Sequence, residues 1–141
     1  MTVSFKSLGL AAMLAVGLAI PAYSQVTATP DLSSVTGACT AEGATIEICQ
    51  AAVAAYVAAL EAAGLSPAEI DAALGEVAVA LGEASQGGAI PEVIAAGLSQ
   101  VASAISDPVQ AAEVTQLASA VAAGSETPVA SIGSPTSASP N

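Results

Sequence analysis

Apolar residues recur at intervals of four, three and four positions in three successive segments of this chain, and a fourth segment keeps the last two intervals. Residues at this spacing lie on one face of an α-helix, where they can pack against neighbouring elements. The sequence therefore predicts an all-α fold, a small alanine-rich bundle of about four short helices between residues 39 and 124. The residues of these four apolar stripes are Cys49, Val53, Tyr56, Leu60; Ile70, Leu74, Val77, Leu81; Ile94, Leu98, Val101, Ile105; and Val114, Leu117, Val121.

Capping signals mark where two of these helices begin. Ser66, Pro67 and Glu69 have the pattern of a capping box, in which the serine and glutamate side chains each bond a backbone N–H group. Asp107 and Gln110 repeat the pattern at the junction formed by residues 106–108, with Gln110 expected in the role of the glutamate. Because the connections are short, neighbouring helices should run roughly antiparallel, with a sharp bend at that junction.

Glycines mark where the predicted helices end. Gly64 and Gly124 follow the last apolar residues of their segments, as C-terminal glycines do. The segments 66–81 and 90–105 also resemble one another position by position. A true internal repeat and a shared alanine-rich composition both explain that similarity, and repeats of fixed period are the usual sign of a repeat architecture.

The first 24 residues have the features of a signal peptide. Lys6 precedes an almost wholly apolar run over 7–20, and the small residues Ala22 and Ser24 predict cleavage after Ser24. An uncleaved membrane anchor is the alternative, but the run is shorter than the roughly 20 residues that span a bilayer. We therefore expect a periplasmic or secreted protein whose mature chain has no stable membrane span.

The rest of the chain divides by composition. Residues 25–38 are rich in Thr and Ser and predict an extended lead-in. Residues 39–124 form the predicted helical domain. Residues 125–141 are mostly Ser, Thr, Pro and small residues, which predicts a disordered tail.

The distribution of charge excludes several classes of partner. Lys6 is the only basic residue and there is no histidine, whereas all twelve acidic residues lie at Asp31 or beyond. A mature chain would thus carry twelve carboxylates and no side-chain cation. Such a chain cannot neutralise phosphates, so we expect no binding to nucleic acid or to anionic lipid. Its carboxylates must be solvated, lie at helix starts or meet the cations of another protein.

Cys39 and Cys49 are the only cysteines, and an even pair in an exported chain predicts a disulfide bond. Two thiols without histidine do not complete a zinc site. Their separation also differs from the CxxC spacing of redox sites. We expect a structural disulfide near the first predicted helix.

No catalytic, metal-binding or cofactor-binding residue can be assigned. The hydroxyl groups lack a histidine or lysine base, so nucleophilic catalysis has no support. Glu69, Glu76 and Glu83 recur every seven residues and would form a ladder for cations on one helix, but a solvated face opposite the Ile70 stripe is the favoured interpretation. We predict that the protein is not an enzyme and needs no cofactor.

Alanine and glycine surround each apolar stripe, so the predicted helices are apolar on nearly every side. Helices of this kind are usually buried on more than one side, and small residues allow close approach. This favours a structural or protein-interaction role over an inert monomer, through self-association or an unknown protein partner. A carrier of a small apolar ligand in the bundle core is the alternative. The chain carries no motif specific enough to assign it to a family.

Overall fold

The computed structural model describes residues 30–125, and the helices account for most of them. In this part of the chain there are no strands, which confirms the all-α class. The predicted signal peptide 1–24 and nearly all of the predicted tail 125–141 lie outside the described residues. The helices are α1 (Leu32–Thr40), α2 (Ile46–Ala62), α3 (Pro67–Gln86), α4 (Pro91–Ala104) and α5 (Pro108–Ala122).

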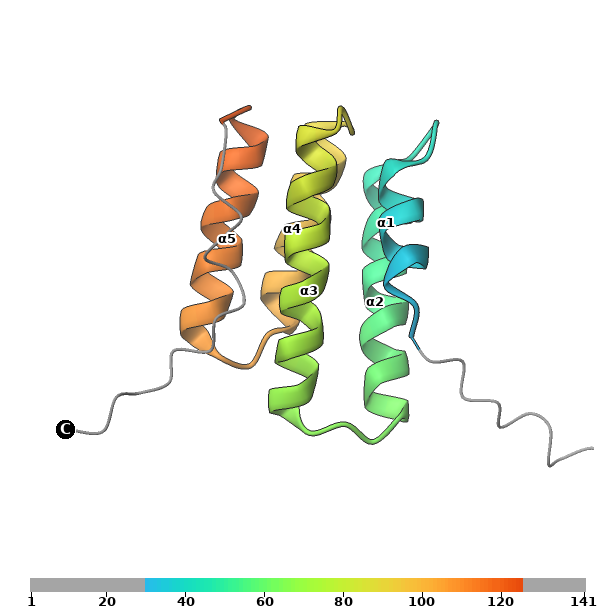
Figure 1. Ribbon diagram of the computed structural model, residues 1–141, viewed down its shortest axis with the longest axis vertical. Coiled ribbons are helices and arrows are strands. Elements are labelled where there is room, and N and C mark those ends of the chain that lie inside the picture. The colour runs from blue at the N-terminus through green and yellow to red at the C-terminus, as the bar shows by residue number, and fades with distance from the viewer. Residues whose placement is uncertain (1–29, 126–141) are drawn as a thin grey trace, which may run out of the picture.

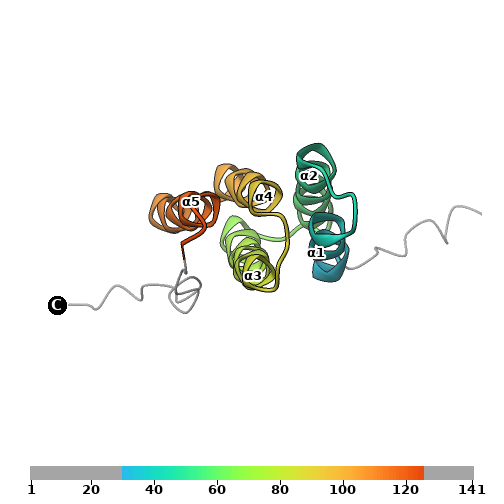
Figure 2. The same cartoon turned by 90° about the horizontal axis from the view of Figure 1, so that it is seen from above.

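The helices α2 to α5 run alternately down and up, as their short connections predict (Figure 1). Seen from above, α2, α4 and α5 form one row, and α1 and α3 form a second row beside it (Figure 2). Helix α4 contacts each of the other four helices, whereas α5 packs mainly against α4 and less extensively against α3. The centre of the bundle is therefore α4, and α5 lies at one edge.

The predicted apolar stripes form the core. Every stripe residue is buried except Ile70, which is half-buried. Burying one such Val, Leu or Ile side chain completely stabilises a fold by about 1.5–3 kcal/mol. The largest side chains with essentially no exposed surface are Leu74, Leu81, Ile94 and Leu98.

The expected extended lead-in over 25–38 is wrong for its second part, because Leu32–Thr40 is helical. Asp31 caps this helix by accepting a hydrogen bond of 2.9 Å from the backbone N–H two residues on. Val35 and Cys39, four residues apart, are both buried in the core. This packing outweighs the weak helix propensity of the Ser- and Thr-rich sequence. The bundle thus has five helices in residues 30–125, where about four were expected.

Two of the predicted helix ends coincide with glycines in the left-handed region of backbone conformation. Gly64 (φ 75°) follows α2 and Gly124 (φ 67°) follows α5. A side chain at either position would be strained, so glycine is the residue best suited to end the helix there.

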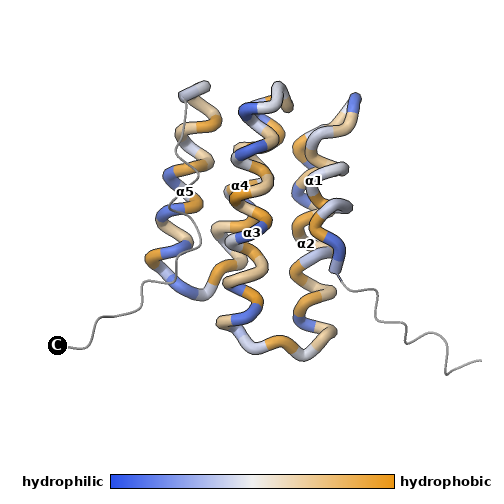
Figure 3. Tube along the Cα trace, viewed as in Figure 1, coloured by the Kyte–Doolittle hydropathy of each residue, from blue (hydrophilic) through white to orange (hydrophobic). Residues whose placement is uncertain are grey.

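Hydrophobic positions recur along every helix, with polar positions between them (Figure 3). Within residues 30–125, no helix is both long enough and apolar enough to cross a bilayer.

Candidate interaction surfaces

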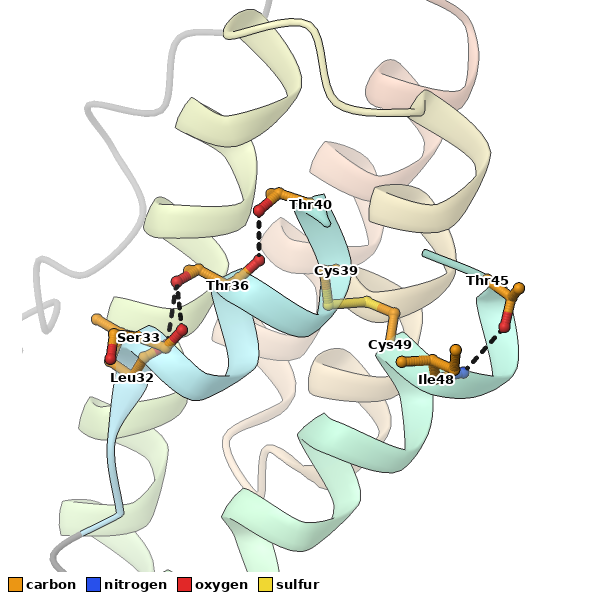
Figure 4. The surroundings of a disulfide bond; sticks show 8 residues. All are labelled: Leu32, Ser33, Thr36, Cys39, Thr40, Thr45, Ile48 and Cys49. Atoms are coloured by element: carbon orange, nitrogen blue, oxygen red, sulfur yellow. Dashed lines mark hydrogen bonds between the residues drawn. A yellow bond between two sulfur atoms is a disulfide. The ribbon is translucent and has the colours of Figure 1, made fainter. Parts of the chain in front are cut away.

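The expected disulfide joins Cys39, near the end of α1, to Cys49, in the first turn of α2 (Figure 4). Both cysteines are buried, and their Cα atoms are 4.5 Å apart. Gly97 of α4 lies against this bond, since a Cβ atom at that position would be 2.6 Å from the Sγ of Cys49. The disulfide therefore links α1 to α2 and packs closely against α4, which gives it a structural role.

The capping box predicted at the start of α3 is confirmed. The Oγ of Ser66 accepts a hydrogen bond of 3.4 Å from the backbone N–H of Glu69, and the backbone N–H of Ser66 donates to Glu69 Oε2 at 2.8 Å. The Ser66 hydroxyl donates to the same oxygen at 2.7 Å. The two bonds that the Glu69 carboxylate accepts lower its pKa below the ordinary value, and the bond from the backbone N–H of Ser66 has the larger effect.

The second predicted capping box, at the start of α5, is wrong in one half. Asp107 Oδ1 accepts bonds from the backbone N–H groups of Val109 and Gln110, at 2.8 and 3.3 Å, as expected. The side chain of Gln110, however, donates through Nε2 to the backbone carbonyl of Asp71 in α3, at 2.8 Å. The reason is that the N–H group of Asp107, which the box would use, is already bonded to the Asp71 carboxylate.

Asp71 is the only buried charged residue among residues 30–125. Its Oδ1 accepts a bond of 2.8 Å from the backbone N–H of Ser106, and its Oδ2 accepts one of 3.0 Å from that of Asp107. A buried carboxylate is tolerated where such donors replace water, and the N-terminus of a helix adds a favourable dipole. We refer to Asp71, Ser106, Asp107 and Gln110 as the Asp71 junction, which holds α3 to the connection between α4 and α5.

The predicted row of glutamates on α3 is divided between two roles. Glu69 caps its own helix, whereas Glu76 and Glu83 are exposed, as the solvated-face interpretation predicts. Glu76 and Glu83 lie seven residues apart on the same helix. They border an open depression of about 470 Å³, which we call the α1–α3 groove; its lining residues are Leu32, Ala72, Gly75, Glu76, Val79, Ala80 and Glu83.

Tyr56 of α2 lies within electrostatic reach of the groove. Burial raises the pKa of its hydroxyl, and the negative charges of Glu76 and Asp31 raise it further. Asp31 directly precedes Leu32, which lines the groove. Carboxylates from two helices thus create a negative potential at this side of the bundle.

A second exposed surface lies on α2. One face of this helix is uncharged and exposed over four turns, and we call it the α2 face. Its residues are Ile48, Ala51, Ala55, Ala58 and Ala62. Ile48 is 50% exposed and is the largest side chain of this face. The face consists of one isoleucine and four alanines, and Glu47 and Glu61 lie beside it on the same helix.

Among residues 30–125, the α1–α3 groove and the α2 face are the candidate interaction surfaces. Within residues 30–125, no three cysteine or carboxylate side chains are close enough together to hold a metal ion. Sequence reasoning missed both the Asp71 junction and the α1–α3 groove, because each depends on residues that lie far apart in the chain. Comparisons with protein families, with curated proteins and with solved structures found no match.

Proposed function

We propose that this protein is exported to the periplasm or the cell exterior and acts without catalysis, by binding protein molecules that include copies of itself. The α2 face carries this proposal. It is an exposed, uncharged strip on a chain that otherwise has acidic residues on every helix or beside it. Small side chains on such a strip allow another helix to approach closely, with little loss of side-chain entropy.

The disulfide supports the proposed location. Disulfide bonds persist in oxidising compartments and are rare in reducing ones. The link between Cys39 and Cys49 is buried and packed against α4, so it belongs to the core of the fold. A chain that depends on this link is suited to the periplasm or the exterior.

The interaction role has more support than the alternative of a carrier for a small apolar ligand. A carrier needs an enclosed apolar cavity. In this bundle Gly97 meets Cys49, Leu81 and Cys39, so no space remains between α4 and the disulfide. The α1–α3 groove, in contrast, is open and bordered by carboxylates.

Sedimentation velocity of the mature chain, residues 25–141, tests self-association. We expect larger species at about pH 4, where carboxylates begin to be neutralised and repulsion between copies falls, than at neutral pH. Ala55→Gln places a longer uncharged side chain in the middle of the α2 face and should return the protein to a monomer. Ala112→Gln, at an exposed position of α5, is the matched control and should associate like the wild type. A wild-type chain that stays monomeric at both pH values and at high concentration would refute self-association.

A further inference from the structure

We propose that the α1–α3 groove is the docking site for a cationic amphipathic helix of a partner protein, whose Lys or Arg side chains pair with Glu76 and Glu83. This inference rests on the proposed interaction role and adds to it the chemistry of the partner and the place where it binds.

The shape of the groove suits a helix that lies along α3. Ala72, Glu76, Val79 and Glu83 follow one another at intervals of four, three and four, so they occupy one face of α3. Apolar and acidic positions alternate along this face. Gly75 has no side chain and Ala80 has only a methyl group. Leu32 of α1 forms the opposite wall of the groove. The floor is therefore apolar and wide enough for the apolar side chains of a partner.

The charges of the groove select a cationic partner. Glu76 and Glu83 are seven residues apart, which is two helical turns and about 10 Å along the axis. A partner helix with cationic residues seven positions apart presents them at the same interval. The mature chain has no side-chain cation to pair with these carboxylates, because the only basic residue of the sequence, Lys6, lies in the predicted leader.

Other occupants fit the groove less well. A second copy of the mature chain would bring twelve more side-chain carboxylates and no side-chain cation. A metal ion would need several oxygen ligands converging on one point, whereas the two glutamates are two turns apart. A cationic helix alone satisfies both the apolar floor and the spaced charges.

The chain contains its own reporter for this site. Tyr56 is the only aromatic residue of residues 25–141, and the charge of Glu76 contributes to its raised pKa. A cation placed beside Glu76 should offset that charge and shift the ionisation of Tyr56 to lower pH. Ultraviolet absorbance follows this ionisation without an added label.

The experiment uses a designed probe peptide of about 20 residues made of leucine, alanine and arginine, with the arginines seven positions apart on one helix face. Arginine is used because it stays charged at the high pH at which Tyr56 ionises. Isothermal titration calorimetry measures its binding to the mature chain. We expect Glu76→Gln with Glu83→Gln to weaken binding about tenfold, as the loss of two ion pairs implies. The control pair, Glu61→Gln with Glu92→Gln, removes the same charge at exposed positions outside the groove and should weaken binding less than about threefold. A peptide of the same composition with its arginines reordered over all faces should bind more weakly.

Three results would overturn the inference: equal weakening by the two variant pairs, equal binding of the two peptides, or an ionisation of Tyr56 that the peptide does not shift. Equal weakening would mean that the peptide responds to the net charge of the chain. Circular-dichroism melting of each variant checks that the bundle is intact. If the peptide does not bind in the groove, self-association through the α2 face can still be tested on its own, because no residue of α2 lines the groove. For the same reason, Ala55→Gln should not change peptide binding.

Discussion

Helices α1 and α2 are held together by a covalent bond, whereas α3 is held to the start of α5 by one buried carboxylate. The disulfide and the Asp71 junction otherwise resemble each other, because each packs against a glycine: Gly97 of α4 beside the disulfide, and Gly75 of α3 beside Gln110. A Cβ atom at Gly97 would be 2.6 Å from the Sγ of Cys49, and one at Gly75 would be 2.8 Å from the Nε2 of Gln110. Both contacts thus depend on the absence of a side chain at one position.

The comparison shows how an alanine-rich chain can acquire a defined packing. Hydrophobic stabilisation scales with buried apolar area at about 25 cal/mol per Å², and a methyl side chain offers little area. Alanine surfaces also allow many alternative helix registers. A disulfide at one place and a set of directional hydrogen bonds at another fix the register where the apolar area alone would not.

The largest effect should come from removing the covalent link. Cys39 and Cys49 are 10 residues apart, and closing a loop of this size stabilises a fold by about 3 kcal/mol in the chain-entropy account. Reduction of the wild type, or Cys39→Ala with Cys49→Ala, should lower the free energy of unfolding by about that amount. Urea unfolding with and without a reductant measures the loss, and the double variant should not respond to the reductant. A wild type with the same urea midpoint in both conditions would contradict this structural role.

The next largest effect should come from the Asp71 junction. Asp71→Ala leaves the N–H groups of Ser106 and Asp107 without their acceptors, and bonds to a charged group contribute about 1.5–3 kcal/mol. We expect a loss of about 2–3 kcal/mol in the free energy of unfolding. Asp71→Asn keeps one carbonyl acceptor and should lose less.

Hydrogen exchange makes this test specific. In Asp71→Ala the amide protons of Ser106 and Asp107 should exchange faster, while those in the middle of α2 keep their protection. Glu83→Ala, an exposed acidic position on the same helix, is the control and should leave both stability and exchange unchanged. Unchanged protection in Asp71→Ala would show that other groups hold the junction.

The sequence predicted those parts of the fold that depend on local pattern. The stripe spacing placed 14 of the 21 buried hydrophobic residues, and the cysteine count predicted the disulfide. Ser66 and Glu69 marked the start of α3 because both partners of a capping box lie within four residues of each other. In each case the interacting groups, or their periodicity, can be recognised within one short segment.

The parts that the sequence did not predict depend on contacts between distant segments. Helix α1 lacks a strong local pattern and is stabilised by the burial of Val35 and Cys39. Asp71 and Ser106 are 35 residues apart, and nothing near Asp71 distinguishes it from the exposed acids of α3. The groove likewise requires Leu32 to lie beside Val79 and Ala80 of another helix.

A smaller effect is expected from filling the space beside the disulfide. Gly97→Ala brings a methyl group against Cys49, which cannot move away while it is linked to Cys39, so we expect a loss of about 1–2 kcal/mol. In the Cys39→Ala, Cys49→Ala background the space is free, and the same change should cost little or stabilise α4 through alanine's helix propensity. A double-mutant cycle from urea unfolding measures this coupling. Gly75→Ala should cost less than Gly97→Ala, because the Gln110 amide is the end of a side chain that can turn aside.

The smallest effect, and the one most sensitive to pH, concerns Glu69 in the capping box. Its pKa is lowered in the folded state by the bonds from Ser66, so the stabilisation is fully present above the ordinary value of 4.5 and is lost as the pH falls through the lowered value. Glu69→Ala should therefore melt at a lower temperature than the wild type at neutral pH, and the two should converge as the pH falls below the lowered pKa of Glu69. Glu61→Ala is the control, because an acidic side chain in the last turn of α2 opposes the helix dipole. Its removal should leave the neutral-pH melting temperature unchanged or raise it.

A lower melting temperature of Glu69→Ala that persists undiminished at the lowest pH would contradict the role of the charged cap. It would mean that the helix propensity or packing of this position matters instead. Such a result would leave the Asp71 junction as the sole acidic contact of α3 that stabilises the bundle.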